Sequence, residues 1–213
     1  AVLAASSAYP EEPTDLLVAN PGKISPDGPF AIYRRTNAGG WSEHLLVRLS
    51  TQSKMMLKIT DIQYAPTDPE RVYAASAEVA EFSDSILGDG TGLFYSTDGG
   101  TTWTNSADFM DNGFMRIAVH PTNPLIAWAA GVNGAGIVKT TNGGVNWQSI
   151  QSPAQTDLNA IVVMDDAGPT LWAGGDAGLM VWNGTSWETR VTGLPELAHV
   201  SVIIVDNAHP GVM

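Results

Sequence analysis

The chain has 213 residues and carries 22 acidic against 10 basic side chains, a formal net charge of −12. Such a charge repels phosphate groups, which argues against nucleic acid and anionic membranes as partners. The chain has no cysteine, which excludes disulfides and thiolate metal sites. No apolar run approaches the ~18 residues that a membrane helix needs, so we expect no membrane insertion. Neutral polysaccharides, cations and basic proteins remain as ligand classes.

Short apolar runs alternate with turn residues along the chain, which contains 22 Gly and 13 Pro. Three times a strand-like run leads through a Pro-containing turn into a second run. These pairs are 59–64 with 71–75, 116–119 with 126–129, and 160–163 with 171–173. Each pair reads as strand, turn and strand. The pattern predicts an all-β protein.

One stretch has helical spacing. Val79, Phe82 and Ile86 are spaced as on a helix face within Ala77–Leu87. Glycines at 88, 90 and 92 follow it. The sequence therefore predicts one short helix at most in this region.

Four turns end on a tryptophan, and we call them the Trp-closed turns: residues 36–41, 96–103, 140–147 and 182–187. The 96–103 turn contains Ser96, Asp98, Gly100 and Trp103, and the 140–147 turn repeats this spacing with Thr140, Asn142, Gly144 and Trp147. The Asp or Asn side chain can bond to nearby backbone, and glycine can adopt positive φ. We therefore expect these eight residues to be structural.

The spacing resembles the Asp-box, or bacterial neuraminidase repeat, whose pattern is Ser/Thr-x-Asp-x-Gly-x-x-Trp. The 96–103 turn matches it in full, and the 140–147 turn has Asn for Asp. The resemblance implies a β-propeller with the box between the third and fourth strands of each four-stranded antiparallel blade. Sialidases, xyloglucanase-type glycoside hydrolases, sortilin-type receptors and a photosystem II assembly factor share this repeat, so it does not fix function.

Strand pairs and Trp-closed turns together predict units of roughly 45–50 residues, the period of a propeller blade. We expect about four blades: blade 1 at 15–50 completed by 198–205, blade 2 at 57–107, blade 3 at 114–151 and blade 4 at 158–192. In one interpretation the last strand closes a four-bladed ring. In the other the chain is a segment that associates with further blades of a larger propeller.

The loops between second and third strands share a propeller face with the connections between blades, and this face usually carries the site. Asp89 and Asp176 lie in such loops of blades 2 and 4. Paired carboxylates can act as acid and base on a glycosidic bond. The resemblance to xyloglucanase-type hydrolases, which have a catalytic Asp in a Thr-Asp-Ile-Gly-Gly-like context, is loose at Gly174–Gly178. The alternative is that both aspartates only stabilise turns.

The longest of these loops, residues 76–91, is rich in Asp, Glu and Ser. Oxygen-rich loops suit Ca²⁺, so this loop is either a cation site or a solvated acidic loop. We expect no other cofactor or metal. A sialidase would need three arginines for the substrate carboxylate, and no arginine here has that family's Arg-Ile-Pro context.

The tryptophans suggest carbohydrate binding, because indole rings stack on sugars. We expect the turn residues Trp41, Trp103, Trp147 and Trp187, and the strand residues Trp128 and Trp172, to be in the core. Trp182 is then the candidate for an exposed, sugar-binding ring.

These observations favour a secreted protein, extracellular or periplasmic, that binds or hydrolyses a polysaccharide or glycan. The small residues of Ala1–Tyr9 are typical of the region near a signal cleavage site, or else the chain is a processed fragment. The alternative function is a non-catalytic propeller scaffold that binds a protein partner.

Overall fold

A computed structural model describes residues 2–5, 15–20, 30–36, 40–47, 55–80, 86–87, 92–110, 112–150, 157–165, 169–190, 192–193 and 199–205. All regular elements in these ranges are β-strands. The described residues include no helix that is long and apolar enough to cross a membrane.

The strands form four antiparallel sheets, one after another along the chain. The first contains β1 (Val2–Ala5), β2 (Asp15–Asn20), β3 (Phe30–Thr36) and β4 (Trp41–Val47). The second contains β5 (Met55–Ala65), β6 (Asp68–Ala80), β8 (Leu93–Ser96) and β9 (Thr104–Asn105), with β7 (Ile86–Leu87) beside β6. The third contains β10 (Phe114–Val119), β11 (Ala127–Gly131), β12 (Ile137–Thr140) and β13 (Gln148–Ser149). The fourth contains β14 (Leu158–Asp165), β15 (Pro169–Gly175), β16 (Gly178–Trp182) and β17 (Trp187–Thr189).

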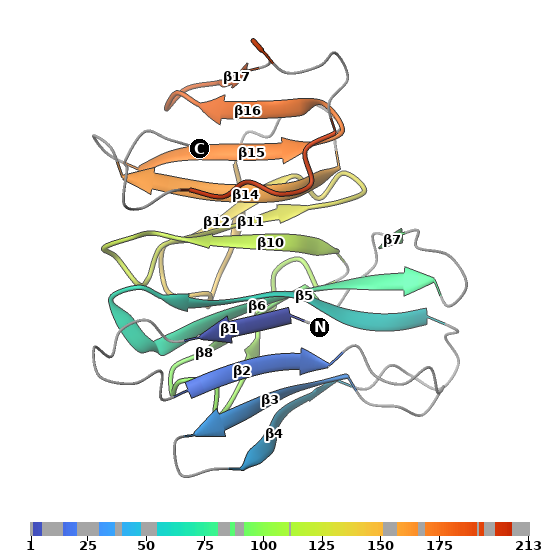
Figure 1. Cartoon of the computed structure of the whole chain (residues 1–213), viewed down its shortest axis with the longest axis vertical. Helices are drawn as coiled ribbons and strands as arrows, with labels where there is room; N and C mark the ends of the chain where they lie inside the picture. Colours follow the sequence, from blue (N-terminus) through green and yellow to red (C-terminus); the bar gives the residue numbers. More distant parts are fainter. Residues whose placement is uncertain are drawn as a thin grey trace.

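This architecture confirms the all-β class and four propeller blades of four antiparallel strands. Figure 1 shows the first strands β1, β5, β10 and β14 toward the middle of the molecule, with β4 and β17 at its two ends. Contacts run from β1 to β5, from β5 to β10 and from β10 to β14. The blades are therefore neighbours in chain order.

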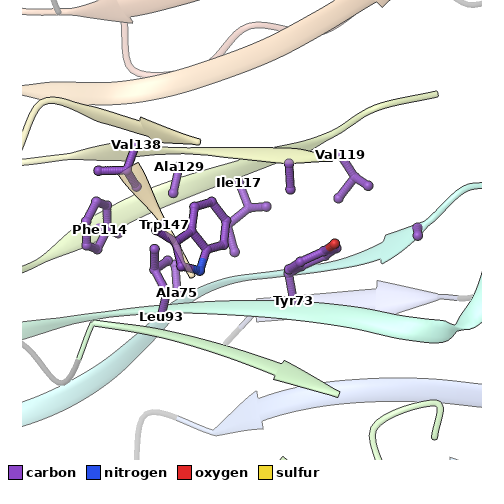
Figure 2. Close-up of a cluster of buried hydrophobic side chains, with 11 residues drawn as sticks. Tyr73, Ala75, Leu93, Phe114, Ile117, Val119, Ala129, Val138 and Trp147 are labelled. Atoms are coloured by element: carbon purple, nitrogen blue, oxygen red, sulfur yellow. The ribbon is translucent and has the colours of Figure 1, made fainter. Parts of the chain in front are cut away.

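The core lies between successive blades. In β6, Tyr73 belongs to the cluster shared with the third blade, while Val72 and Ala74 belong to the cluster shared with the first. In β11, Trp128 likewise faces the fourth blade. Side chains alternate between the two faces of a strand, so the middle blades are apolar on both faces. Figure 2 shows the cluster between the second and third blades, where the Tyr73 and Trp147 rings meet edge to face at 6.2 Å.

Three of the first strands carry a β-bulge, near the beginning of β10 and β14 and midway along β5. The register shifts between Ile59 and Asp61 in β5, between Phe114 and Arg116 in β10, and between Leu158 and Ala160 in β14. A bulge bends a strand and redirects its side chains. No pattern in the sequence predicts this repeated feature.

One expectation about elements is corrected, and another is tested only in part. The first position of blade 1 is held by β1, which pairs with β2, and residues 199–205 are not part of that sheet. Those residues instead begin beside blade 4, where the Val200 amide donates to the Gly175 carbonyl at 3.1 Å. Of the stretch with helical spacing, residues 77–80 belong to β6, where they pair with β5, and residues 86–87 form β7, which pairs with β6. Residues 81–85 lie outside the described residues, so the prediction of one short helix at most stays a prediction there.

The 96–103 and 140–147 turns connect third and fourth strands, as predicted, and have the same internal geometry. Ser96 Oγ donates to Asp98 Oδ1 at 2.8 Å and accepts from the Gly100 amide at 2.8 Å. Thr140 Oγ1 does the same with Asn142 and Gly144, at 3.0 Å each.

The burial of the tryptophan side chains differs from the prediction. Trp147 and Trp128 are buried, but Trp41 is 51% exposed, so its assignment to the core was wrong. Trp182, expected to be exposed, is half-buried and packs beside Trp187, with ring centroids 5.5 Å apart. Trp103, Trp172 and Trp187 are also only half-buried. The tight hairpin at 182–187 explains the Trp182 packing, since it pairs Trp182 directly with Trp187.

Candidate functional site

Asp176 lies in the two-residue loop between β15 and β16, on the side of blade 4 where β14 begins. Two glycines at the end of β15 determine what lies beside it. A Cβ on Gly175 would lie 1.9 Å from the Asp157 carbonyl oxygen, and one on Gly174 would lie 2.4 Å from Val200. Because both positions lack a side chain, Asp157 and the 199–205 segment can approach the backbone of β15.

This close packing brings His199 to Asp176. His199 Nδ1 and Asp176 Oδ1 are 2.7 Å apart, across 23 positions of sequence. A carboxylate oxygen accepts, so the proton is on Nδ1 and Nε2 is left to solvent. The side chains are 53% and 59% exposed, respectively. The pair is therefore accessible to a ligand from solvent.

Asp157 joins the loops of blades 3 and 4. Its carbonyl accepts from the Asp176 amide at 3.3 Å, and its Oδ1 accepts from the Asn133 amide at 2.7 Å. Asn133 lies in the loop that connects β11 and β12 and has a φ of 51°. The second-to-third loops of two blades thus both bond to Asp157, one to its carboxylate and the other to its backbone carbonyl. We call Asn133, Asp157, Asp176 and His199 the loop-face cluster.

The loop-face cluster offers two carboxylates and one imidazole, which are groups able to transfer protons. His199 Nδ1 donates a hydrogen bond to Asp176 Oδ1, and Asp176 Oδ2 has no hydrogen bond to any described residue. That oxygen could reach a substrate. Nowhere in the described ranges do three or more His, Cys, Asp or Glu side chains form a group suited to a metal ion.

The remaining predicted site residues do not join this cluster. Asp89 lies outside the described residues, so its pairing with Asp176 stays a prediction. Most of the acidic loop 76–91 also lies outside them, although residues 76–80 belong to β6. Trp182 is at the far end of β16, away from the β15–β16 loop. The predicted Ca²⁺ site and the sugar-binding role of Trp182 stay predictions.

Sequence reasoning missed Asp157 and His199. No spacing signal links either residue to Asp176, because the three lie on separate segments. The Gly174–Gly175 pair was the available clue, since adjacent small residues at a strand end permit close backbone approach.

No protein-family model and no curated protein matches the chain. Among solved structures, the GH74 enzyme of Niastella koreensis has a TM-score of 0.60 at 18% identity, over 88% of this chain and 29% of that one. An ancestral GH74 enzyme has a TM-score of 0.53 at 18% identity, over 80% of this chain and 23% of that one. YCF48 bound to a D1 peptide has a TM-score of 0.51 at 14% identity, over 87% of this chain and 51% of that one.

These likenesses show the propeller fold. The chain spans less than a third of the length of the two GH74 enzymes and about half of YCF48. At such low identity, fold similarity does not carry over activity or partners.

Proposed function

We propose that this chain belongs to an Asp-box β-propeller of the glycoside hydrolase type, secreted from the cell, which binds neutral polysaccharide at the loop-face cluster. The observation that carries the proposal is the exposed Asp176 carboxylate, which His199 orients at 2.7 Å on the face built by second-to-third loops. The likeness to two GH74 folds agrees with it. The net charge of −12 favours a neutral glycan over an anionic one.

In this proposal Asp176 acts as one of the two carboxyl groups that glycoside hydrolysis needs. The hydrogen bond from His199 fixes its orientation and leaves one oxygen for the sugar or the attacking water. Asp89 stays the partner predicted from sequence, and Asp157 is a second candidate. The separation of the two carboxyl groups would decide whether the anomeric configuration is retained or inverted.

The test is the release of reducing ends from a panel of neutral plant and microbial polysaccharides. We expect Asp176→Asn to lower the rate by about 100-fold or more, the usual contribution of a general acid or base. Glu70→Gln is the matched control, because Glu70 is exposed on another blade and its side chain is not in the cluster. Near-UV circular dichroism verifies that both variants remain folded. Equal rates for wild type and Asp176→Asn would refute a catalytic role.

A non-catalytic scaffold for a protein partner is the second candidate. The likeness to YCF48 with a bound peptide favours it, as do exposed apolar side chains such as Trp41 and Ile204, 51% and 76% exposed. A scaffold predicts no sugar release from any substrate and a partner recovered by pull-down. Trp41→Ser would then weaken the capture, whereas Asp176→Asn would leave it unchanged.

A further inference from the structure

A polar pocket of about 430 Å³ lies at the outer edge of blade 3, beside the 140–147 turn. The connection between β9 and β10 contributes Asp108 to its wall, and the rest of the lining comes from β12, the turn, β13 and Ile150 just after β13. Its polar lining includes Asp108, Lys139, Asn142, Asn146 and Gln148. The volume falls in the range of small-molecule sites. None of these residues belongs to the loop-face cluster.

Part of the lining is fixed in place. Asp108 Oδ2 accepts from the Trp147 amide at 2.9 Å and from Asn146 Nδ2 at 3.3 Å. Asn142 Nδ2 donates to Asn146 Oδ1 at 3.1 Å. These bonds connect the turn of blade 3 to the segment between β9 and β10, so three polar side chains hold their positions before any ligand arrives. Such preorganisation lowers the entropic cost of binding.

Other polar side-chain groups in the pocket form no hydrogen bond or ion pair with the described residues. The Lys139 ammonium lies 5.4 Å from the centre of the Trp128 ring and forms no ion pair with any described carboxylate. Gln148 is exposed, and its side-chain amide has no hydrogen bond to the described residues. The same holds for Asp108 Oδ1. One wall of the pocket is therefore ordered, and donors and acceptors are still available for a ligand.

The charges in the pocket indicate which class of ligand it can bind. One carboxylate and one ammonium balance each other, and the chain as a whole is strongly acidic. Anions are disfavoured by the global charge, and small cations by Lys139. Sugar hydroxyls both donate and accept, so they suit a mixture of carboxylate, ammonium and amide groups. Ile150, also in the lining, offers apolar contact to the C–H face of a ring.

We propose that this pocket is a second carbohydrate site, which binds a neutral sugar unit independently of the loop-face cluster. It goes beyond the function proposed above, because it needs neither Asp176 nor any hydrolysis.

The test uses amide NMR shifts of the full chain during titration with xylose, glucose, galactose and cellobiose. We expect at least one sugar to give saturable shifts at Gln148, Asn146 and the Trp147 amide. The double variant Lys139→Met, Gln148→Ala should weaken that affinity about tenfold or more, as expected for two lost hydrogen bonds. Lys58→Met is the control, because Lys58 is exposed on blade 2 outside the pocket.

The outcome separates the two proposals. Asp176→Asn should lower the rate of sugar release by about 100-fold or more and leave these shifts intact. Unchanged affinity in the double variant would overturn the pocket proposal. So would shifts confined to Asp176 and His199, or no saturable shift with any of the sugars.

Discussion

Asp98 and Asn142 occupy the same position in two turns, but they bond to different partners. Asp98 Oδ2 accepts from the Thr102 hydroxyl at 2.6 Å, whereas Asn142 Nδ2 donates to Asn146 Oδ1 at 3.1 Å. Burial acts to raise the pKa of the Asp98 carboxyl, but hydrogen bonds from Thr102 and Ser96 outweigh it and hold the pKa below its ordinary value. The residue four positions later thus complements the carboxylate in one turn and the amide in the other.

Asp61 connects blades 2 and 3 at the bulge of β5. It is 5% exposed, and its Oδ2 accepts from the Ile117 amide at 2.8 Å. Its Oδ1 accepts from the Ile62 amide and from Gln63 Nε2, both at 3.0 Å. Burial raises the pKa of Asp61, and hydrogen bonds from Ile117 and Gln63 offset part of that rise, as does the charge of Arg116.

Removal of this carboxylate should weaken the junction between the blades. Asp61→Ala leaves the buried Ile117 amide without its acceptor, so we expect the free energy of unfolding to fall by about 1–3 kcal/mol. Urea denaturation of the wild type and of Asp61→Ala measures this difference in the free energy of unfolding. An Asp68→Ala variant, which removes a single bond to the Glu70 amide near the surface, should cost less.

The raised pKa of Asp61 also predicts a pH dependence. The folded state binds this proton more tightly than the unfolded state, whose Asp pKa is about 3.9. The stability of the wild type, relative to Asp61→Asn, should therefore fall as pH rises from about 4 through the folded-state pKa, and then level off. Urea midpoints of both proteins between acid and neutral pH measure this difference. A difference that rises with pH in this range would contradict the assignment.

At the scale of elements, each full Trp-closed turn packs on the preceding blade. A Cβ on Gly100 would lie 2.9 Å from Leu17 Cδ1, and one on Gly144 would lie 2.8 Å from Tyr95 Cβ. Arg71 Nη1 of blade 2 also donates to the Gly143 carbonyl at 2.8 Å. The turn is therefore part of the interface between blades as well as a hairpin connection.

The 182–187 turn lacks this role, although it also ends on tryptophan. Asn183 Oδ1 accepts from the Thr185 and Ser186 amides at 2.9 and 2.8 Å, which makes a small exposed turn. A Cβ on Gly184 would meet nothing within 4 Å. Counting tryptophans cannot distinguish the two kinds of turn.

Alanine substitution separates backbone strain from packing. Gly144 and Gly184 have φ values of +93° and +96°, so alanine is strained at both, by about 1–2 kcal/mol. Gly144→Ala should cost a further 1–3 kcal/mol or so, because Tyr95 Cβ cannot rotate away. Thermal unfolding of both variants measures the difference. Equal losses would mean that the turn does not pack on blade 2 as described.

At the scale of the whole molecule, the loop-face cluster depends on how closely successive segments pack. Asp157 precedes β14, Asp176 follows β15 and His199 begins the segment beside blade 4. The absence of a side chain on Gly175 lets the first two meet, with the Asp157 carbonyl where a Cβ would be.

Gly175→Ala should therefore disturb the site as well as the fold. The new methyl would force Asp157 away, at a cost of about 1–3 kcal/mol, and should change the imidazole shifts of His199 in NMR spectra. Gly40→Ala is the control, because a Cβ there would meet nothing within 4 Å. If His199 keeps its wild-type shifts in Gly175→Ala, the glycine does not position the cluster.

The sequence by itself determined the fold class and the local chemistry of the two full turns. Strand alternation, Pro-containing turns and the Ser96–Trp103 spacing act over a few residues, so they can be read without tertiary contacts. The tertiary structure alone decided the bulges at Asp61 and its counterparts, the place of β1 in blade 1, the exposure of Trp41 and the meeting of Asp157, Asp176 and His199. These depend on packing between segments far apart in the chain, and such packing leaves no periodic signal in the sequence.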